Sequence, residues 1–356
     1  MARDGDRGRV IFIGGVHEAE PVLRGLLECA PDAGADVVAV FTLSAQAGAK
    51  VSGPVDLAPL AQRSGVPVHR VDNVNDPDVV ERIRGLRPDL IVCAGWTRLL
   101  KDALLRVPAR GCVGFHASML PKHRGRAPVN WAILRGETRA GNTMFMLDPE
   151  ADTGDIIDQR AVPIAPDATC ADVYAAVAAA GAEMLRTNLR GLLDGTAPRI
   201  PQPISVGEPL PKRTPAMGIT DWNRPARGIH DWIRALTAPY PGAFTFIGER
   251  KVMLWRSLVP AADEVKADPG HIVSCDATGV RVGTRHGSIV ITEMSDAGCD
   301  PQSAHTWFQS SGLQVGECFD AVDPAVSRWA QGLGPMPAET EVTLTGVRRA
   351  AASAGS

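Results

Sequence analysis

The segment from Gly114 to Ile133 concentrates side chains that could take part in catalysis. Its twenty positions include two His, one Ser, two Arg, two Gly and two Pro. Ordering a polar loop of this kind costs conformational entropy, so we expect it to have a binding or catalytic role. About twenty residues later, Asp152 and Asp155 enclose a Thr-Gly pair just before an apolar pair. An imidazole that titrates near neutral pH, together with a carboxylate, predicts general acid–base catalysis.

The residues before this segment predict the scaffold that positions it. Apolar runs and helical spacings alternate as strand 10–13, helix 18–30, strand 36–41, helix 56–64, strand 66–69, helix 76–86 and strand 89–94. This rhythm predicts an α/β fold with an open, mostly parallel Rossmann-like sheet and helices on both faces. Sites in such sheets lie beyond the carboxyl ends of the strands.

A proline-rich stretch, 198–215, predicts a change of domain because it favours extended backbone. Short strands follow a helix around Asp231–Leu236, and they predict a smaller β-rich domain of OB-like barrel type. The predicted order is a catalytic domain over 8–205, the OB-like domain over 206–315, and a partly flexible C-terminal extension over 316–356.

The composition excludes several classes of protein. The chain has 356 residues, a formal net charge of -3, 45% hydrophobic and 22% charged residues, which predicts a soluble globular protein. It has no apolar run of about 18 residues and no signal-peptide pattern, so we expect no membrane span and a cytoplasmic location. Seven scattered cysteines without a Cys-x-x-Cys pair predict no metal site. The slightly negative charge argues against a dedicated nucleic-acid binder.

These motifs together resemble the folate-dependent formyltransferases. The family signature is Asn-x-His-x-Ser-x-Leu-Pro, then Arg-Gly, then an Asp-x-Gly-Asp loop, and residues 8–205 carry most of it. The Arg-Gly-Arg-Ala-Pro-x-Asn-Trp variant at 124–131 is most similar to the sugar-nucleotide branch, and a weaker resemblance to methionyl-tRNA formyltransferase-like proteins continues into the C-terminal domain. The resemblance implies a one-carbon transferase that moves a formyl group from 10-formyltetrahydrofolate to a primary amine, without a metal.

The resemblance also implies roles for individual residues. His116 matches the catalytic histidine, Asp152 the catalytic aspartate, and Ser118 flanks them in the motif. The matched folate-binding residues are Arg98, Leu99, Leu100, Arg126, Asp148, Pro149, Glu150, Ala151 and Asp152.

Gly114 departs from the family pattern because the family has its catalytic Asn at this position. An amide there would stabilise the developing oxyanion, a contribution often worth ~3 kcal/mol. A backbone N–H or a water could serve instead, since glycine lets a ligand approach closely. Asn142 or Asn130 could replace the amide, although Asn142 after Gly141 also suits a surface turn. Alternatively, the reaction has been lost or changed.

Three classes of acceptor amine compete: methionyl-tRNA, an amino-sugar nucleotide, and a small amine of specialised metabolism such as hydroxyornithine. Residues 211–315 contain eleven Lys or Arg and ten Asp or Glu, which gives little support to a tRNA-binding domain. A small-molecule amine therefore ranks first and methionyl-tRNA second. A catalytically altered folate-binding homologue is a third reading. A dehydrogenase ranks below these because Gly14-Gly15 lacks the G-x-G-x-x-G fingerprint. A homodimer is left open.

Overall fold

The computed structural model describes residues 7–203, 209–261, 265 and 267–337, which fall into two compact units. The first unit comprises Met1–Val129, Arg139–Ile164 and Asp172–Leu210, and the second comprises Asn130–Thr138, Ala165–Ala171 and Pro211–Ser356. Two short segments inside the predicted 8–205 domain thus belong to the second unit. The predicted boundary at 205/206 lies outside the described residues, as does the predicted extension from residue 338 onward.

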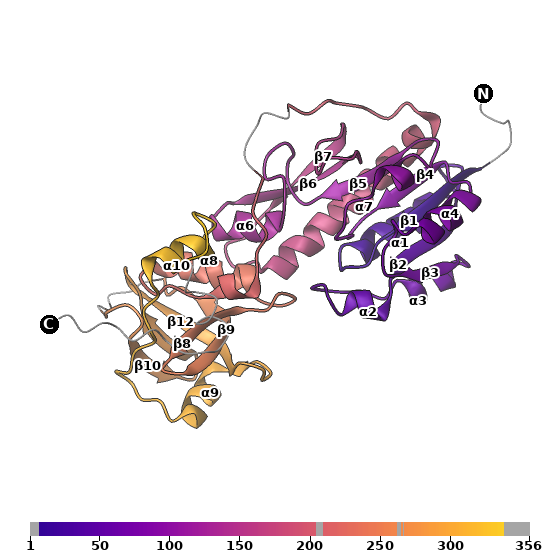
Figure 1. Ribbon diagram of the computed structural model, residues 1–356. Coiled ribbons are helices and arrows are strands. Elements are labelled where there is room, and N and C mark those ends of the chain that lie inside the picture. Colours follow the sequence, from indigo (N-terminus) through magenta and orange to yellow (C-terminus); the bar gives the residue numbers. More distant parts are fainter. Residues whose placement is uncertain (1–6, 204–208, 262–264, 266, 338–356) are drawn as a thin grey trace. The chain divides into compact units, whose positions relative to one another are not determined.

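A seven-stranded sheet organises the first unit (Figure 1), in the order β3-β2-β1-β4-β5-β6-β7. Its strands are β1 (Gly8–Ile13), β2 (Ala35–Leu43), β3 (Val68–Val71), β4 (Leu90–Cys93), β5 (Cys112–His116), β6 (Arg139–Met146) and β7 (Ile156–Pro163). The strands from β3 to β5 pair in parallel, and β6 and β7 pair antiparallel. The predicted α/β fold with a mostly parallel sheet is therefore confirmed.

Helices cover both faces of this sheet. The helices up to residue 194 are α1 (Ala19–Cys29), α2 (Ala45–Gly48), α3 (Ala58–Arg63), α4 (Pro77–Gly85), α5 (Asp102–Leu105), α6 (Pro128–Leu134) and α7 (Cys170–Asp194), of which α6 belongs mostly to the second unit. Successive side chains of β1 point to opposite faces, as the strand period requires. Val10 and Phe12 pack in one buried cluster with Leu23 of α1 and with residues of α7. Ile11 packs in a second cluster with Ile83 of α4.

The order of the strands along the chain reverses between β1 and β4, since the chain leaves β1 for β2 on one side and later returns to β4 on the other side. The loops after β1 and β4 are joined by hydrogen bonds from the Gly15 and Val16 N–H groups to the Gly95 oxygen, each 3.0 Å. The backbones approach closely here, because a Cβ at Gly14 would lie 2.6 Å from the Ala94 carbonyl oxygen and one at Gly95 would lie 2.9 Å from the Val16 oxygen. The carboxyl end of β5, with His116, follows at the same edge of the sheet because β4 and β5 are parallel.

The second unit is built around an antiparallel sheet in the order β10-β11-β12-β9-β8, with β13 paired to β12. Its elements are η1 (Pro215–Gly218), α8 (Ala226–Leu236), β8 (Ala243–Ile247), β9 (Arg250–Leu258), β10 (Ile272–Asp276), β11 (Gly279–Gly283), β12 (Ser288–Asp296), β13 (Gln302–Ser303), α9 (Ala304–Ser311) and α10 (Pro324–Ala330). All its strand pairs are antiparallel. This confirms the predicted second, β-rich domain. Within the described residues, no helix is both long and apolar enough to cross a membrane.

Candidate active site

His116 ends β5, where it pairs in register with Thr143 of β6, and only 8% of it is exposed. Its Nδ1 lies 3.5 Å from Oδ1 of Asp152. Its Nε2 lies 2.8 Å from the main-chain oxygen of His123. Both ring nitrogens therefore face hydrogen-bond acceptors. The ring is thus held between the Asp152 carboxylate and the His123 main-chain carbonyl.

Asp152 is held in place by main-chain and side-chain contacts from three directions. Its φ of 60° is in the left-handed region, which a non-glycine residue adopts only when its surroundings impose it. Its Oδ2 accepts a hydrogen bond from the Gly125 main-chain N–H at 2.9 Å. The Gln202 amide donates to the main-chain oxygens of Asp152 and Gly154, at 3.2 and 2.7 Å. The carboxylate is thus fixed beside His116.

Thr143 fixes the loop that follows His116. Its hydroxyl donates to the Ser118 main-chain oxygen at 2.7 Å and accepts from the Leu120 N–H at 3.1 Å. The Gln159 amide donates both to this hydroxyl, at 2.9 Å, and to the Leu120 oxygen, at 2.8 Å. Ser118, predicted from the motif, uses its own hydroxyl to donate to the Lys122 oxygen at 2.7 Å. The Ser118 side chain therefore stabilises the loop.

Leu147 occupies the space beside Gly114 that a side chain would need. A Cβ at Gly114 would lie 2.4 Å from Cδ2 and 3.0 Å from Cγ of Leu147. The Leu147 side chain thus fills the volume beside Gly114, and an asparagine at position 114 would fit only if Leu147 moved.

The side-chain amides of Asn142 and Asn130 are both engaged in other hydrogen bonds. Asn142 is buried, and its amide donates to the Val177 oxygen of α7 at 2.8 Å. In β6 it alternates with Thr143, which faces His116, so Asn142 points to the opposite face of the sheet. Asn130 belongs to the second unit and donates to the Ala235 oxygen at 2.6 Å. The structure therefore does not support replacement of the family Asn by either residue.

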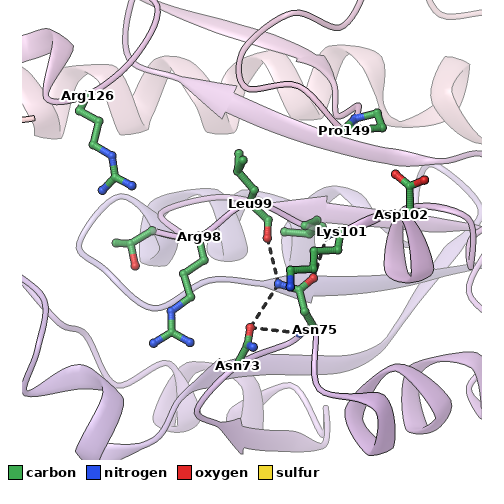
Figure 2. Close-up of a pocket in the computed structure, with 10 residues that line it drawn as sticks. Asn73, Asn75, Arg98, Leu99, Lys101, Asp102, Arg126 and Pro149 are labelled. Carbon is green, nitrogen blue, oxygen red and sulfur yellow. Dashed lines mark hydrogen bonds between the residues drawn. The ribbon is translucent and has the colours of Figure 1, made fainter. Parts of the chain in front are cut away.

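A pocket of about 630 Å³ in the first unit gathers several predicted folate-binding residues (Figure 2). Of the predicted set, it is lined by Arg98, Leu99, Leu100, Arg126 and Pro149. The side chain of Leu99 lies at this pocket and is exposed, as an apolar ligand contact requires. Asp148, Glu150, Ala151 and Asp152 belong to the same loop as Pro149 but are not lining residues.

Sequence reasoning missed the polar wall of this pocket. Asn75 accepts a hydrogen bond from the Lys101 N–H at 2.8 Å and donates to the Leu99 oxygen at 2.9 Å, so it fixes the segment after β4 (Figure 2). Asn73 accepts from the Asn75 amide at 3.2 Å. Arg98 donates to the Asp72 oxygen at 3.0 Å. The Asn-x-Asn spacing after the third predicted strand was the signal that could have identified this wall.

Sequence reasoning also missed Glu18, which it treated only as the start of a helix. Burial raises the pKa of the Glu18 carboxyl, while the nearby charges of His17 and His116 lower it. Glu18 is therefore a second carboxyl group, after Asp152, whose charge interacts with that of His116.

Comparisons with known proteins agree with this architecture. The family model described as formyl transferase matches residues 8–189, and that described as formyl transferase, C-terminal domain, matches residues 212–312. The methionyl-tRNA formyltransferase of Trichlorobacter lovleyi is 38% identical over 311 residues, which cover 86% of this chain and 96% of the relative. That of Geobacter sulfurreducens is 37% identical, covering 80% of this chain and 88% of the relative.

Two solved structures share the fold. HypX from Aquifex aeolicus in complex with tetrahydrofolic acid has a TM-score of 0.61 at 20% identity, covering 89% of this chain and 49% of HypX. The N-formyltransferase from Helicobacter canadensis, in complex with folinic acid and dTDP-3-aminofucose, has a TM-score of 0.60 at 20% identity. That match covers 80% of this chain and 98% of the other.

Proposed function

Because the chain belongs to the formyl transferase family, we propose that it transfers the formyl group of 10-formyltetrahydrofolate to a primary amine, with His116 and Asp152 as its catalytic pair. The observation that carries this proposal is the burial of an imidazole beside a fixed carboxylate at the carboxyl end of β5, 3.5 Å apart. The proposed site also lies where ligands bind in open α/β sheets.

The pocket of Figure 2 is the proposed folate site. Its volume of about 630 Å³ lies within the usual range for a small-molecule pocket of roughly 300–1,000 Å³. Main-chain groups at Arg98–Leu100 and the amides of Asn73 and Asn75 offer the donors and acceptors that a flat heterocycle requires. Arg126 adds a positive charge for an anionic part of the ligand. The tetrahydrofolic acid bound to HypX, which shares the fold, supports this assignment.

The proposed reaction replaces one bond to the formyl carbon by another. 10-Formyltetrahydrofolate supplies the formyl carbon: a bond from the acceptor nitrogen forms, the bond from N10 breaks, and one proton passes from the acceptor nitrogen to N10. Nε2 of His116 lies 2.8 Å from the His123 carbonyl oxygen, to which a proton on this nitrogen is donated. A developing oxyanion is a stronger acceptor than that carbonyl and can take over the hydrogen bond.

Asp152 positions the His116 ring through Nδ1 and stabilises positive charge that develops on the ring during the reaction. Since Gly114 supplies no side-chain donor, more of the oxyanion stabilisation falls on His116 in this chain than in a family member that has the amide.

For the acceptor, we propose methionyl-tRNA as the first candidate. The relatives with this activity match almost end to end, 96% of the Trichlorobacter lovleyi enzyme being covered at 38% identity. A small amine, which the sequence ranked first, is the second candidate. The combination of Gly114 and Leu147 favours this candidate, because it departs from the family pattern where the oxyanion of the formyl group would be stabilised. The dTDP-3-aminofucose bound to a protein of the same fold also supports it.

The test is an acceptor comparison with the purified full-length chain. The protein is mixed with 10-formyltetrahydrofolate and either methionyl-tRNA or an amino-sugar nucleotide, and tetrahydrofolate release and acceptor formylation are measured together. Release with methionyl-tRNA alone supports the first candidate, and release with the amino sugar alone supports the second. Absence of release with these and with a wider panel of primary amines contradicts the proposed transfer.

A further inference from the structure

The chain that follows α7 returns to the loop of Asp152 before it leaves the first unit. We call its described residues, 195–203 and 209–210, the exit segment. Ile200 exchanges two main-chain hydrogen bonds with Ile156, the first residue of β7, at 2.8 and 2.9 Å. Two residues later, Gln202 is buried, with 8% of it exposed. The exit segment is therefore packed against the end of the loop that carries Asp152.

The Gln202 amide fixes the main chain of this loop. Its Nε2 donates to the main-chain oxygens of Asp152 and Gly154, at 3.2 and 2.7 Å. Both partners are carbonyl oxygens, so the amide nitrogen is the atom that has to face them. Asp152 depends on such support because a φ of 60° is unfavourable for a residue with a side chain.

Leu210 supports the other part of Asp152, its carboxylate, through Gly125. The Leu210 N–H donates to the Arg124 oxygen at 2.7 Å, and the Leu210 oxygen accepts from the Arg126 N–H at 3.2 Å. Leu210 and Gly125 thus pair as in a parallel sheet, and the Gly125 N–H points away from Leu210. That N–H donates to Oδ2 of Asp152 at 2.9 Å.

The close approach of Leu210 requires glycine at position 125. The φ of Gly125 is 101°, and a Cβ there would lie 2.6 Å from the Leu210 oxygen. Leu210 itself is buried, with 6% exposed. The next residue, Pro211, begins the second unit, where its oxygen accepts a hydrogen bond from Nε1 of Trp131 at 3.0 Å. The chain is therefore fixed on both sides of the Leu210–Pro211 bond.

We propose that Gln202 and Leu210 are positioning residues for the transfer: together they hold the Asp152 carboxylate beside His116. This inference rests on the proposed formyl transfer. Gln202 fixes the main chain of Asp152, and Leu210 fixes the N–H that binds its carboxylate, which lies 3.5 Å from Nδ1 of His116. Neither residue lines the pocket of Figure 2. Loss of either contact should therefore slow the chemical step without weakening folate binding.

Gln202→Met in the full-length chain tests the first contact, because methionine has a similar length and removes both donated hydrogen bonds. We expect kcat for tetrahydrofolate release to fall about tenfold, since a small misplacement of a catalytic group slows the reaction. The acceptor KM and the affinity for folinic acid should not change. Arg199→Met is the matched control at an exposed position of the exit segment, and it should keep the wild-type kcat.

Leu210→Pro and Leu210→Ala separate the main-chain contact from side-chain packing. Proline removes the N–H that donates to Arg124, whereas alanine keeps both main-chain groups and removes the buried side chain. The neighbours, Pro209 and Pro211, already favour the extended backbone that a third proline adopts. We expect Leu210→Pro to lose about tenfold in kcat and Leu210→Ala to lose less, although Leu210→Ala lowers the melting temperature. A larger loss of kcat in Leu210→Ala would overturn the role of Leu210.

A double-mutant cycle with Asp152→Ala separates positioning from a general structural role. If Gln202 acts through Asp152, Gln202→Met lowers the kcat of the wild type about tenfold but changes that of Asp152→Ala by less than about twofold. A structural role elsewhere would lower kcat equally in the two backgrounds. Equal losses, or a wild-type kcat in Gln202→Met, would overturn the inference.

Failure of the proposed function is distinguishable, because the wild type would then formylate no acceptor. The positioning role is still measurable from the ring 1H–13C NMR signals of His116, assigned by their loss in His116→Asn. A shift of these signals in Gln202→Met that is absent from Arg199→Met supports the inference. No shift, or an equal shift in the two variants, contradicts it.

Discussion

The segment around His116 and Asp152 differs from the residues after β1 in how well its polar groups are satisfied. The first is fixed by a dense hydrogen-bond network in which Thr143 makes three contacts. After β1, both buried ring nitrogens of His17 have no hydrogen-bond partner within the described residues. Electrostatic catalysis requires preorganised polar groups, so we expect changes in the first region to have the larger effect on turnover.

The largest effect is expected from His116→Ala. Loss of the imidazole removes the proton donor and the group that Asp152 positions, so turnover should fall by about 10²–10⁴-fold. The assay is tetrahydrofolate release with the acceptor that the wild type uses. His286→Ala, a change at an exposed histidine of the second unit, is the control and should retain full turnover. Near-normal turnover of His116→Ala would contradict a catalytic role for this region.

Asp152→Ala should have the next largest effect, about 10²-fold or more on kcat. The ring of His116 loses the partner of Nδ1, and the Gly125 N–H loses its acceptor. The fold should persist because the Asp152 side chain contributes no apolar packing, and circular dichroism with a thermal melt checks this. The control is Asp194→Ala, which removes an exposed carboxylate paired with Arg190 at the end of α7. Wild-type kcat in Asp152→Ala would contradict the positioning role.

Thr143→Val tests the comparison by removing hydrogen bonds to the loop after His116 while leaving His116 and Asp152 unchanged. Valine keeps the shape but removes the hydroxyl from three hydrogen bonds, two of them buried, which should cost about 1–3 kcal/mol of unfolding free energy. We expect kcat to fall roughly tenfold because the loop after His116 is less well fixed, while the acceptor KM stays the same. Denaturant unfolding and steady-state kinetics measure the two effects. Equal losses in kcat and in acceptor affinity would show that the two regions are not separate.

The smallest effect is expected at Gly114. Gly114→Asn alone should cost about 1–3 kcal/mol, because its Cβ would meet Leu147 at 2.4 Å. The double change Gly114→Asn with Leu147→Ala makes room for the amide, and we expect it to raise kcat above that of Leu147→Ala if ordinary formyl transfer occurs. A fall in acceptor binding in the double variant would instead show that Gly114 leaves space for the acceptor.

The sheet and the helices that flank it were predictable because local periodicity determines them. The runs at 10–13 and 89–94 correspond to β1 and β4, since strands buried on both faces are continuously apolar. The family was predictable from the motif around His116 and from the Asp152 loop, and the family comparisons confirm it. The roles of these two residues stay predictions.

Other features depend on contacts that no local pattern contains. Asn142 could be assigned to a face only once the register of β6 against β5 was known. Glu18 gave no signal beyond a helix start, because its relation to His116 arises from the strand order. Leu147 fills the place beside Gly114 through packing between residues thirty-three positions apart. Segments 130–138 and 165–171 join the second unit through long-range contacts that composition does not encode.

The central claim, that His116 and Asp152 act together in formyl transfer, is tested most directly by steady-state kinetics of Asp152→Ala with the acceptor that the wild type uses. We predict that Asp152→Ala lowers kcat about 10²-fold with little change in the acceptor KM. A kcat equal to that of the wild type, or a rise in the acceptor KM without loss of kcat, would contradict the account.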